Sequence, residues 1–429
     1  MPSSKSVDTI STLAAALDNQ TVERLKKIVT HLPISKSPTR KTDLIDLITA
    51  HMGGGELAKR WAELDKLQQA AIAEVVHSES SHYQSEQFVA KYGRSPDWGT
   101  GRFGYHDYKP SRLYLFFYNG ILPEDLKKRL KAFVPKPVEV QAQSANTIPN
   151  SFPLQVYEYD ANLNRSVAVV KEIPIRQQST ESAALQDLLT VLRLIQSGKV
   201  AVSDKTRHPG AATLKTIAAV LQGGDFYGPE DEPKEEYAQK IGEIKPFAWC
   251  LLVQAGGLAE LAGKKLQLTK AGLKALTSPP AETLRGIWRK WLKTTLIDEF
   301  RRVDEIKGQT GKGGRSLTAV SGRRAAITQA LSECPVGEWM AIDDFFRYMK
   351  AKQYTFDVTR DPWSLYLCEP GYGALGYEGF GSWEILQGRY TLCFLFEYVA
   401  TLGFIDVAYV PPRRVRTDFR KNWGADDLS

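Results

Sequence analysis

One local pattern occurs four times along this 429-residue chain and limits how the chain can fold. An apolar run with helical spacing meets a glycine and is then followed by a short extended segment. Glycine at a helix C-terminus adopts the left-handed conformation that ends the helix at little cost. The four stops are Asn119-Gly120, Gly198, Gly256-Gly257 and Gly403.

Short helices followed by a small hairpin are the local order of a winged helix, although ordinary α/β connections also use glycine stops. Because the expected strands are few and separated by several helices, a parallel sheet is disfavoured. The clearest hairpin is expected at Leu258–Leu268, with Gly263-Lys264 at its turn. The sequence therefore predicts a mainly α chain with short β hairpins, an α+β fold of tandem helix-turn-helix or winged-helix units.

Turn residues and composition also divide the chain. Gly53-Gly54-Gly55 predicts the end of a first helical unit, and a stretch rich in Pro, Gln, Ser and Asn predicts a linker in which Leu154–Tyr159 and Val167–Val170 form short strands. Long helices are expected over Ala281–Ile306 and Trp383–Thr401. The expected segments are a helical domain at 1–55, a helix-turn-helix or winged-helix unit at 56–138, the linker at 139–181, one or more winged-helix domains at 182–278, a C-terminal winged-helix domain with a basic loop at 279–412, and a basic tail at 413–429.

The charge of the chain is unevenly distributed. The net charge is only +7, yet the stretch from Arg285 to Arg324 holds eleven basic against four acidic residues. From Tyr409 to Gly424 there are five basic residues against one acid. Basic segments in a near-neutral remainder suggest a surface that faces a polyanion, of which nucleic acid is the commonest. Solvated helix faces are the alternative for each segment taken singly.

Basic side chains stand where helix-turn-helix proteins contact phosphates, at expected helix starts, at the hairpin turn, and in the glycine-rich loop and the tail. For each cluster we weigh a nucleic-acid contact against a solvated surface. The predicted nucleic-acid-binding residues are Lys36, Arg40, Lys41, Lys205, Arg207, Lys215, Lys264, Lys265, Lys270, Lys307, Lys312, Arg315, Arg323, Arg324, Arg413, Arg414 and Arg416.

No arrangement of residues predicts catalysis. The loop Gly308–Gly314 lacks the spacing of a phosphate-binding loop, and no histidine lies in a catalytic or zinc-binding context. The four cysteines form no CxxC pair, so we expect small buried side chains in a reducing compartment. The most apolar stretch, Tyr390–Val410, contains Glu397 and Asp406, and only seven uncharged residues precede the first of these acids, which is too short a run to span a bilayer. We therefore expect a non-enzymatic cytoplasmic, nucleoid-associated protein without cofactor or metal; an unrecognised nuclease is the enzymatic alternative.

Residues 20–52 resemble a SAP motif, a helix–loop–helix that binds DNA in its family. The matching positions are Leu25, Lys41, Leu44 and Ile45, whereas Ser37-Pro38 stands where the family has a loop glycine. The match covers less than a tenth of the chain. The resemblance implies a DNA contact near the start of the second helix.

The rest of the chain is similar to the helicase-associated, multi-winged-helix regions found beside XPB-type helicases of bacteria and archaea. Three phrases carry the similarity: Leu266–Gly272, Val336-Gly337-Glu338-Trp339 before Ile342-Asp343, and Trp383-Glu384 with Leu402–Asp406. Helicase motor motifs are missing from the sequence. The similarity implies an accessory or targeting subunit that works with a separate helicase or nuclease, in genome maintenance or in defence against foreign DNA.

The sequence thus favours a non-catalytic DNA-binding adaptor, with double-stranded DNA favoured over single-stranded DNA. The alternative is a scaffold whose winged helices bind partner proteins. The acidic segment Gly228–Lys240 and the aromatic loops at 99–108 and 361–382 motivate that alternative.

Overall fold

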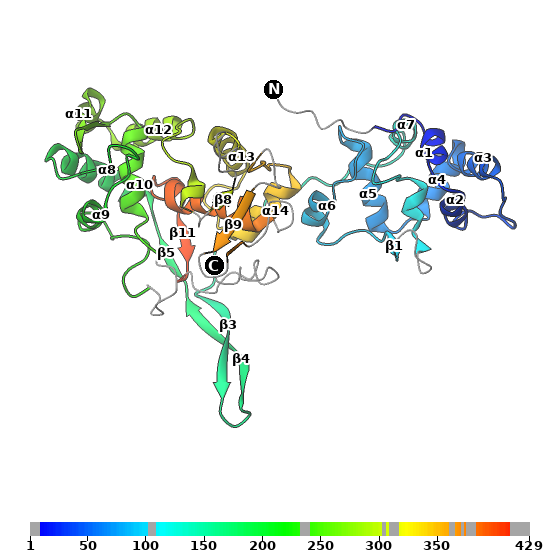
Figure 1. Cartoon of the computed structure of the whole chain (residues 1–429), viewed down its shortest axis with the longest axis horizontal. Coiled ribbons are helices and arrows are strands. Elements are labelled where there is room, and N and C mark those ends of the chain that lie inside the picture. The colour runs from blue at the N-terminus through cyan, green and yellow to red at the C-terminus, as the bar shows by residue number, and fades with distance from the viewer. Residues whose placement is uncertain are drawn as a thin grey trace. The chain divides into compact units, whose positions relative to one another are not determined.

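A computed structural model describes residues 9–101, 109–231, 241–302, 306–308, 317–359, 365–369, 373–374 and 383–411. The chain forms two compact units. Unit 1 comprises Met1–Gln143 with Arg347–Gln353, and unit 2 comprises Ser144–Phe346 with Tyr354–Ser429. Helices dominate both units, and the sheets are small and antiparallel, so the predicted α+β class is confirmed (Figure 1).

Unit 1 is built from helices around one core. Apolar side chains from the first to the last of these helices, Leu13 to Val134, belong to a single buried cluster. The predicted units 1–55 and 56–138 therefore share a core, and Gly54 begins a helix where a boundary was expected. The elements are α1 Leu13–Asp18, α2 Val22–Val29, α3 Lys41–His51, α4 Gly54–Ala62, α5 Lys66–His77, α6 Ser85–Tyr92, β1 Gly99–Thr100, β2 Lys109–Pro110, η1 Arg112–Leu115 and α7 Glu124–Leu130.

Local sequence explains where several of these helices begin. The Thr12 and Thr21 hydroxyls accept from amides of the first turns of α1 and α2. Asp65 forms a reciprocal capping box with Gln68 at the start of α5. Such caps satisfy amides that have no partner within the helix, and each stabilises its helix by about 1 kcal/mol.

Unit 2 combines helical segments with small hairpins. The helix α14 begins in unit 2, and its last residues are assigned to unit 1. The elements are β3 Ser151–Asp160, β4 Arg165–Pro174, β5 Arg176–Gln178, α8 Glu181–Gln196, α9 Ala211–Ala218, α10 Lys245–Ala255, β6 Ala259–Ala262, β7 Lys265–Leu268, α11 Lys270–Ala275, α12 Pro280–Trp291, η2 Glu299–Arg301, β8 Ile306–Gly308, α13 Val320–Ser332, α14 Ile342–Ala351, β9 Leu365–Glu369, β10 Gly373–Ala374, η4 Glu384–Gly388, α15 Arg389–Cys393, η5 Phe394–Val399 and β11 Val407–Tyr409.

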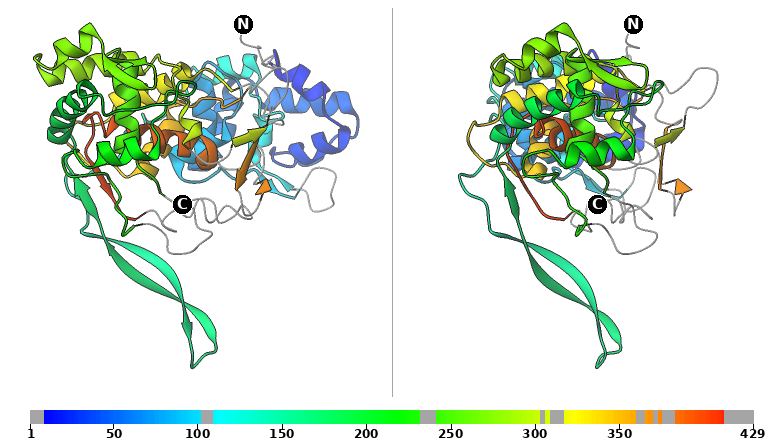
Figure 2. Two further views of the ribbon diagram at one scale, coloured as in Figure 1. Left: turned by 60° about the vertical axis from the view of Figure 1, so that its left-hand side comes forward. Right: turned by 90° about the vertical axis from the view of Figure 1, so that its left-hand side faces the viewer.

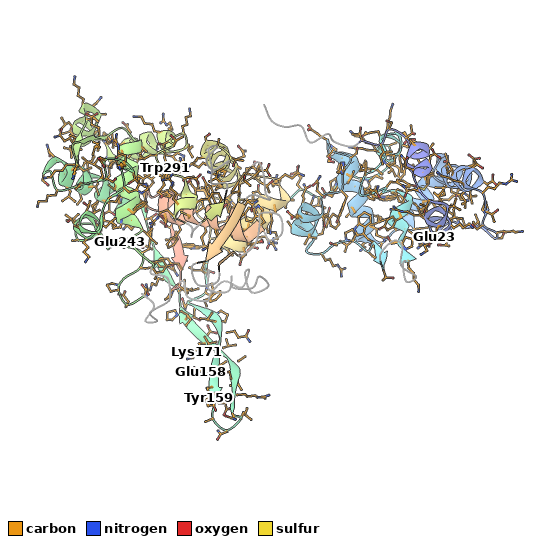
Figure 3. All side chains as sticks on the ribbon, in the orientation of Figure 1. Glu23, Glu158, Tyr159, Lys171, Glu243 and Trp291 are labelled. Carbon is orange, nitrogen blue, oxygen red and sulfur yellow. The ribbon has the colours of Figure 1, made fainter. Side chains whose placement is uncertain are left out.

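The predicted linker at 139–181 contains a long β-ribbon rather than short strands. The strands β3 and β4 pair in register over ten residues, from Ser151↔Pro174 to Asp160↔Arg165. This ribbon projects from the helices of unit 2 (Figures 1 and 2). Glu158, Tyr159 and Lys171 lie on it (Figure 3). The strands predicted at Leu154–Tyr159 and Val167–Val170 are present within β3 and β4. Their lengths were underestimated because only the most apolar part of each strand was recognised.

Two other expectations about unit 2 have different outcomes. The long helix predicted over Ala281–Ile306 is wrong, because α12 ends at Trp291. Beyond that point the carbonyls of Thr294 and Ile297 accept hydrogen bonds from the Arg324 guanidinium instead of from helix amides. The helix predicted at Trp383–Thr401 is present as the consecutive segments η4, α15 and η5, two of them π-helical.

The glycine stops adopt the backbone conformation that the sequence predicts. Gly120, Gly198, Gly257 and Gly403 all have positive φ, between 67° and 78°. At Gly403 a Cβ would also lie 2.8 Å from the Ala184 Cβ, so the chain passes close to α8. Within the described residues, no helix is long and apolar enough to cross a membrane.

Candidate nucleic-acid interface

A three-stranded arrangement forms where the sequence predicts a hairpin. The strands β6 and β7 pair around Gly263, which has φ +65°, so the predicted hairpin at Leu258–Leu268 is confirmed. The extended residues after α8 join β7 on its other side. The Leu266 amide donates to the Val200 carbonyl at 2.9 Å, and the Val202 amide donates to the Lys264 carbonyl at 3.0 Å.

The helices and strands of this region have a definite order along the chain. The order is α8, the extended residues 200–202, α9, α10, and then β6 and β7. The helix α11 packs tightly on the hairpin, since a Cβ on Gly272 would lie 2.0 Å from the Leu258 carbonyl oxygen. Only glycine allows this approach, and the Thr269 hydroxyl caps the same helix.

Three exposed lysines belong to this hairpin and to the residues that lead into the strand beside it. Lys264 and Lys265 are exposed on the turn and on β7, and Lys199 is exposed just before the strand that pairs with β7. The Lys265 ammonium lies about 4 Å from the position a Cβ would take on Gly198, so it stands beside the residue that precedes Lys199. We call Lys199, Lys264 and Lys265 the lysine cluster. None of the three has an ion pair within the described part of the chain.

More exposed basic side chains follow on the next two helices. Lys270, which the sequence predicts, is the first residue of α11. Lys199 and Lys274 were not among the predicted residues, and neither were the basic residues of α12, although they lie in the basic stretch from Arg285 to Arg324. Leu284, Ile287 and Trp291 are buried, and this spacing leaves a basic stripe on the opposite face of the helix. The exposed residues of that stripe and its continuation are Arg285, Arg289 and Lys293.

The loop before α9 carries the predicted residues Lys205 and Arg207. Lys205 is exposed and Arg207 is half-buried in the left-handed region, with φ +64°. The loop is held in place, because the Ser203 hydroxyl accepts from the Lys205 amide and the Arg207 carbonyl accepts from the Gln254 side chain at 3.0 Å. Lys215 is exposed on α9.

Arg323 and Arg324 do not belong to an exposed interface, so the structure corrects their assignment. Both are buried in unit 2, with relative exposures of 1% and 0%. Arg323 pairs with Asp298, and the Arg324 Nε donates to the Glu299 Oε1 at 2.7 Å. The prediction failed because a position near the start of a helix does not show whether the side chain faces solvent or the core.

The predicted residues of unit 1 have mixed environments. Lys36 and Arg40 are exposed, and Arg40 is the N-cap of α3 without a side-chain cap. Lys41 is half-buried, with its ammonium 3.3 Å from the Asp18 Oδ1. Lys41 is therefore partly neutralised within the protein. Leu25 and Leu44 of the SAP-like positions are buried in the core of unit 1.

The side chains of the remaining predicted residues lie outside the described part of the chain. Lys307 is in β8, but its side chain lies outside the described residues. Lys312, Arg315, Arg413, Arg414 and Arg416, most of the acidic segment after Asp231, and most of both aromatic loops also lie outside the described residues.

A cavity of about 320 Å³ opens beside the N-terminus of α13. Its charged lining residues are Asp298 and Arg301, and Asp298 is already paired with Arg323. Elsewhere in the described residues, no group of three or more His, Cys, Asp or Glu could hold a metal ion. Burial raises the pKa of the Cys250 thiol to about 12, so this cysteine stays protonated and unreactive.

Comparisons with protein-family models, with curated proteins and with solved structures gave no match for this chain.

Proposed function

We propose that the chain is a non-catalytic DNA-binding adaptor. In this proposal the segment from α8 to β7 is a winged-helix unit, and β6 and β7 form its wing. The order of helices and strands supports this interpretation, as does the pairing of residues 200–202 with β7.

The observation that carries the proposal is the lysine cluster. When exposed cations without a neutralising carboxylate contact phosphates, counterions condensed on the DNA are released. This release of counterions dominates the affinity for DNA of any sequence. Further exposed positive charges follow the hairpin in the sequence: Lys270 and Lys274 on α11, and the basic stripe of α12.

The test is a binding titration of the full chain with a fluorescent duplex at ~50 and ~200 mM salt. The variant Lys264→Glu/Lys265→Glu should bind the duplex about tenfold more weakly or worse, and its salt dependence should be shallower by about 1 to 2 in log–log slope. The double variant Arg165→Glu/Lys171→Glu on the ribbon changes net charge equally and should keep most of the affinity. Unchanged binding in the Lys264→Glu/Lys265→Glu variant would refute the proposal.

The SAP-like helices α2 and α3 and the similarity to helicase-associated regions extend the proposal. Exposed Lys36 and Arg40 would supply a second DNA contact, in unit 1. A separate helicase or nuclease would supply the catalytic activity in the cytoplasm, in genome maintenance or defence against foreign DNA. Retention of such an enzyme through purification, with its DNA processing reduced by Lys264→Glu/Lys265→Glu, is the expected outcome.

A second candidate function, a protein-interaction scaffold, rests on the ribbon. Val170 and Tyr159 are 64% and 66% exposed, and the outer edge of β4 pairs with no other strand among the described residues. The ribbon carries two basic and three acidic residues, which disfavours a polyphosphate partner. We therefore propose that an extended apolar segment of a partner protein would add to this edge.

This candidate differs from the first in its test. One partner protein should be retained in fixed proportion by the unmodified chain and lost from Val170→Asp, while neither protein shows salt-sensitive DNA binding. Self-association that Val170→Asp abolishes would identify a second copy of the chain as the partner instead. A monomer without retained partner would remove the scaffold interpretation.

A further inference from the structure

The helix that reads bases in a helix-turn-helix unit is the second of its two consecutive helices, and it must expose side chains to the groove. In the proposed winged-helix unit this position belongs to α10. All nine residues from Lys245 to Val253 are buried. The following residue, Gln254, uses its side-chain amide to donate to the carbonyls of Arg207 and Cys250.

The surroundings of α10 explain its burial. The helices α8, α9, α12 and the segment η5 all pack against it, as does β6. Trp291 of α12 stacks on Tyr398 of η5 with ring centroids 4.4 Å apart, and both side chains are fully buried. Figure 3 labels Trp291 within this helical part of unit 2. Elements that follow α10 in the chain thus occupy the space that a DNA groove would need.

The one basic residue of α10 is also committed to the interior. The Lys245 ammonium lies 3.4 Å from the Asp187 Oδ2 and donates to the Gly224 carbonyl at 2.9 Å. Lys245 and Asp187 are 3% and 1% exposed. Reaching a phosphate or a guanine would leave the buried Asp187 carboxylate without its cation.

The exposed cations of this unit include instead the lysine cluster, Lys205 in the loop before α9 and Lys215 on α9. The exposed cations of α11 and α12 follow in the chain. A hairpin turn, a loop and the outer faces of these helices present ammonium and guanidinium groups, whose contacts with phosphates carry no sequence information. We infer that this unit binds duplex DNA through contacts with the phosphate backbone of the DNA alone, and that it does not discriminate base sequence. This inference rests on the proposed function.

The experiment compares the full chain with Lys264→Glu/Lys265→Glu on a panel of equal-length duplexes of unrelated sequence at one salt concentration. The expected ratio of dissociation constants, variant over unmodified chain, is tenfold or more and the same within about threefold on every duplex. If the unit read bases, the charge-reversed hairpin would displace it from the groove, and its base contacts would be lost together with its phosphate contacts. The ratios would then differ between sequences, because specific sites bind ~10³-fold or more tightly than others.

The outcomes separate the inference from the proposed function. A ratio that varies by more than threefold across the panel overturns the inference while DNA binding by the unit stands. A ratio near one on every duplex, or no binding by the unmodified chain, overturns the proposed function and the inference with it. Because each ratio compares two proteins on the same duplex, sequence preference contributed by unit 1 cancels.

Discussion

The buried pair of Arg324 and Glu299 provides a prediction that separates stability from DNA binding. Both side chains have 0% exposure. The Arg324 guanidinium donates to Glu299 and to the carbonyls of Trp291, Thr294 and Ile297. The same guanidinium lies 4.5 Å from the centroid of the Trp291 ring. Arg324 therefore connects the end of α12 to α13.

Replacing Arg324 with methionine keeps an apolar stem and removes the charge. Glu299 would then be a buried carboxylate with the Tyr390 hydroxyl, at 2.6 Å, as its remaining side-chain partner. Removing one member of a buried ion pair costs about 3–5 kcal/mol, because the other charge stays buried without compensation. The carbonyls of Trp291, Thr294 and Ile297 would each lose a hydrogen-bond donor, which would lower the stability of unit 2 further.

The assay is equilibrium urea unfolding of the full chain followed by circular dichroism. With a slope of ~2–3 kcal/mol per molar urea, the transition of unit 2 should move down by about 1 to 2 M in Arg324→Met. The matched control is Arg289→Met on the exposed face of α12, where a change within about 0.5 kcal/mol is expected. The double variant Glu299→Met/Arg324→Met should recover part of the loss, because no unpaired charge remains.

The refuting result is a loss below about 1 kcal/mol in Arg324→Met, which would mean that the pair is dispensable. A folded Arg324→Met protein that binds DNA with much lower affinity would refute the structural role in a different way. It would restore Arg324 to the interface that the sequence predicted.

Two further predictions concern unit 2. Gly272→Ala should destabilise it by several kcal/mol, since the added Cβ would lie 2.0 Å from the Leu258 carbonyl oxygen. On α12 the Cβ of Gly286→Ala would meet nothing within 4 Å, so this variant should stabilise the unit by about 0.5–1 kcal/mol. Thermal denaturation measures both changes, and equal stabilities of the two variants would contradict the prediction. Burial, and then nearby arginines, lower the pKa of His208. As the pH is lowered below about 6.5, His208 therefore takes up a proton in the unfolded chain before it does so in the folded chain, and the stability of the fold decreases. Urea midpoints at two pH values should therefore fall less in His208→Gln than in the unmodified chain, and an identical fall would exclude this contribution.

The sequence by itself determined much of the local structure. Glycine stops at Gly120 and Gly198 needed only the conformational freedom of glycine, which no tertiary contact has to supply. The hairpin around Gly263 and the position of Lys264 and Lys265 at its turn follow from the same local preferences. These features depend on residues close together in the chain, so periodicity and turn chemistry reveal them.

The tertiary structure alone decided which charges face solvent. Arg323 and Arg324 look like any other basic pair at a helix start, but Asp298 and Glu299, 25 residues earlier, draw both into the core. Lys245 is buried for the same reason, because Asp187, 58 positions earlier in the sequence, lies beside it. Burial depends on partners brought together by packing, and no local pattern encodes it. That is why the sequence predicts an apolar helix before the stop at Gly256-Gly257, which is α10, but does not show that the whole surface of this helix is buried.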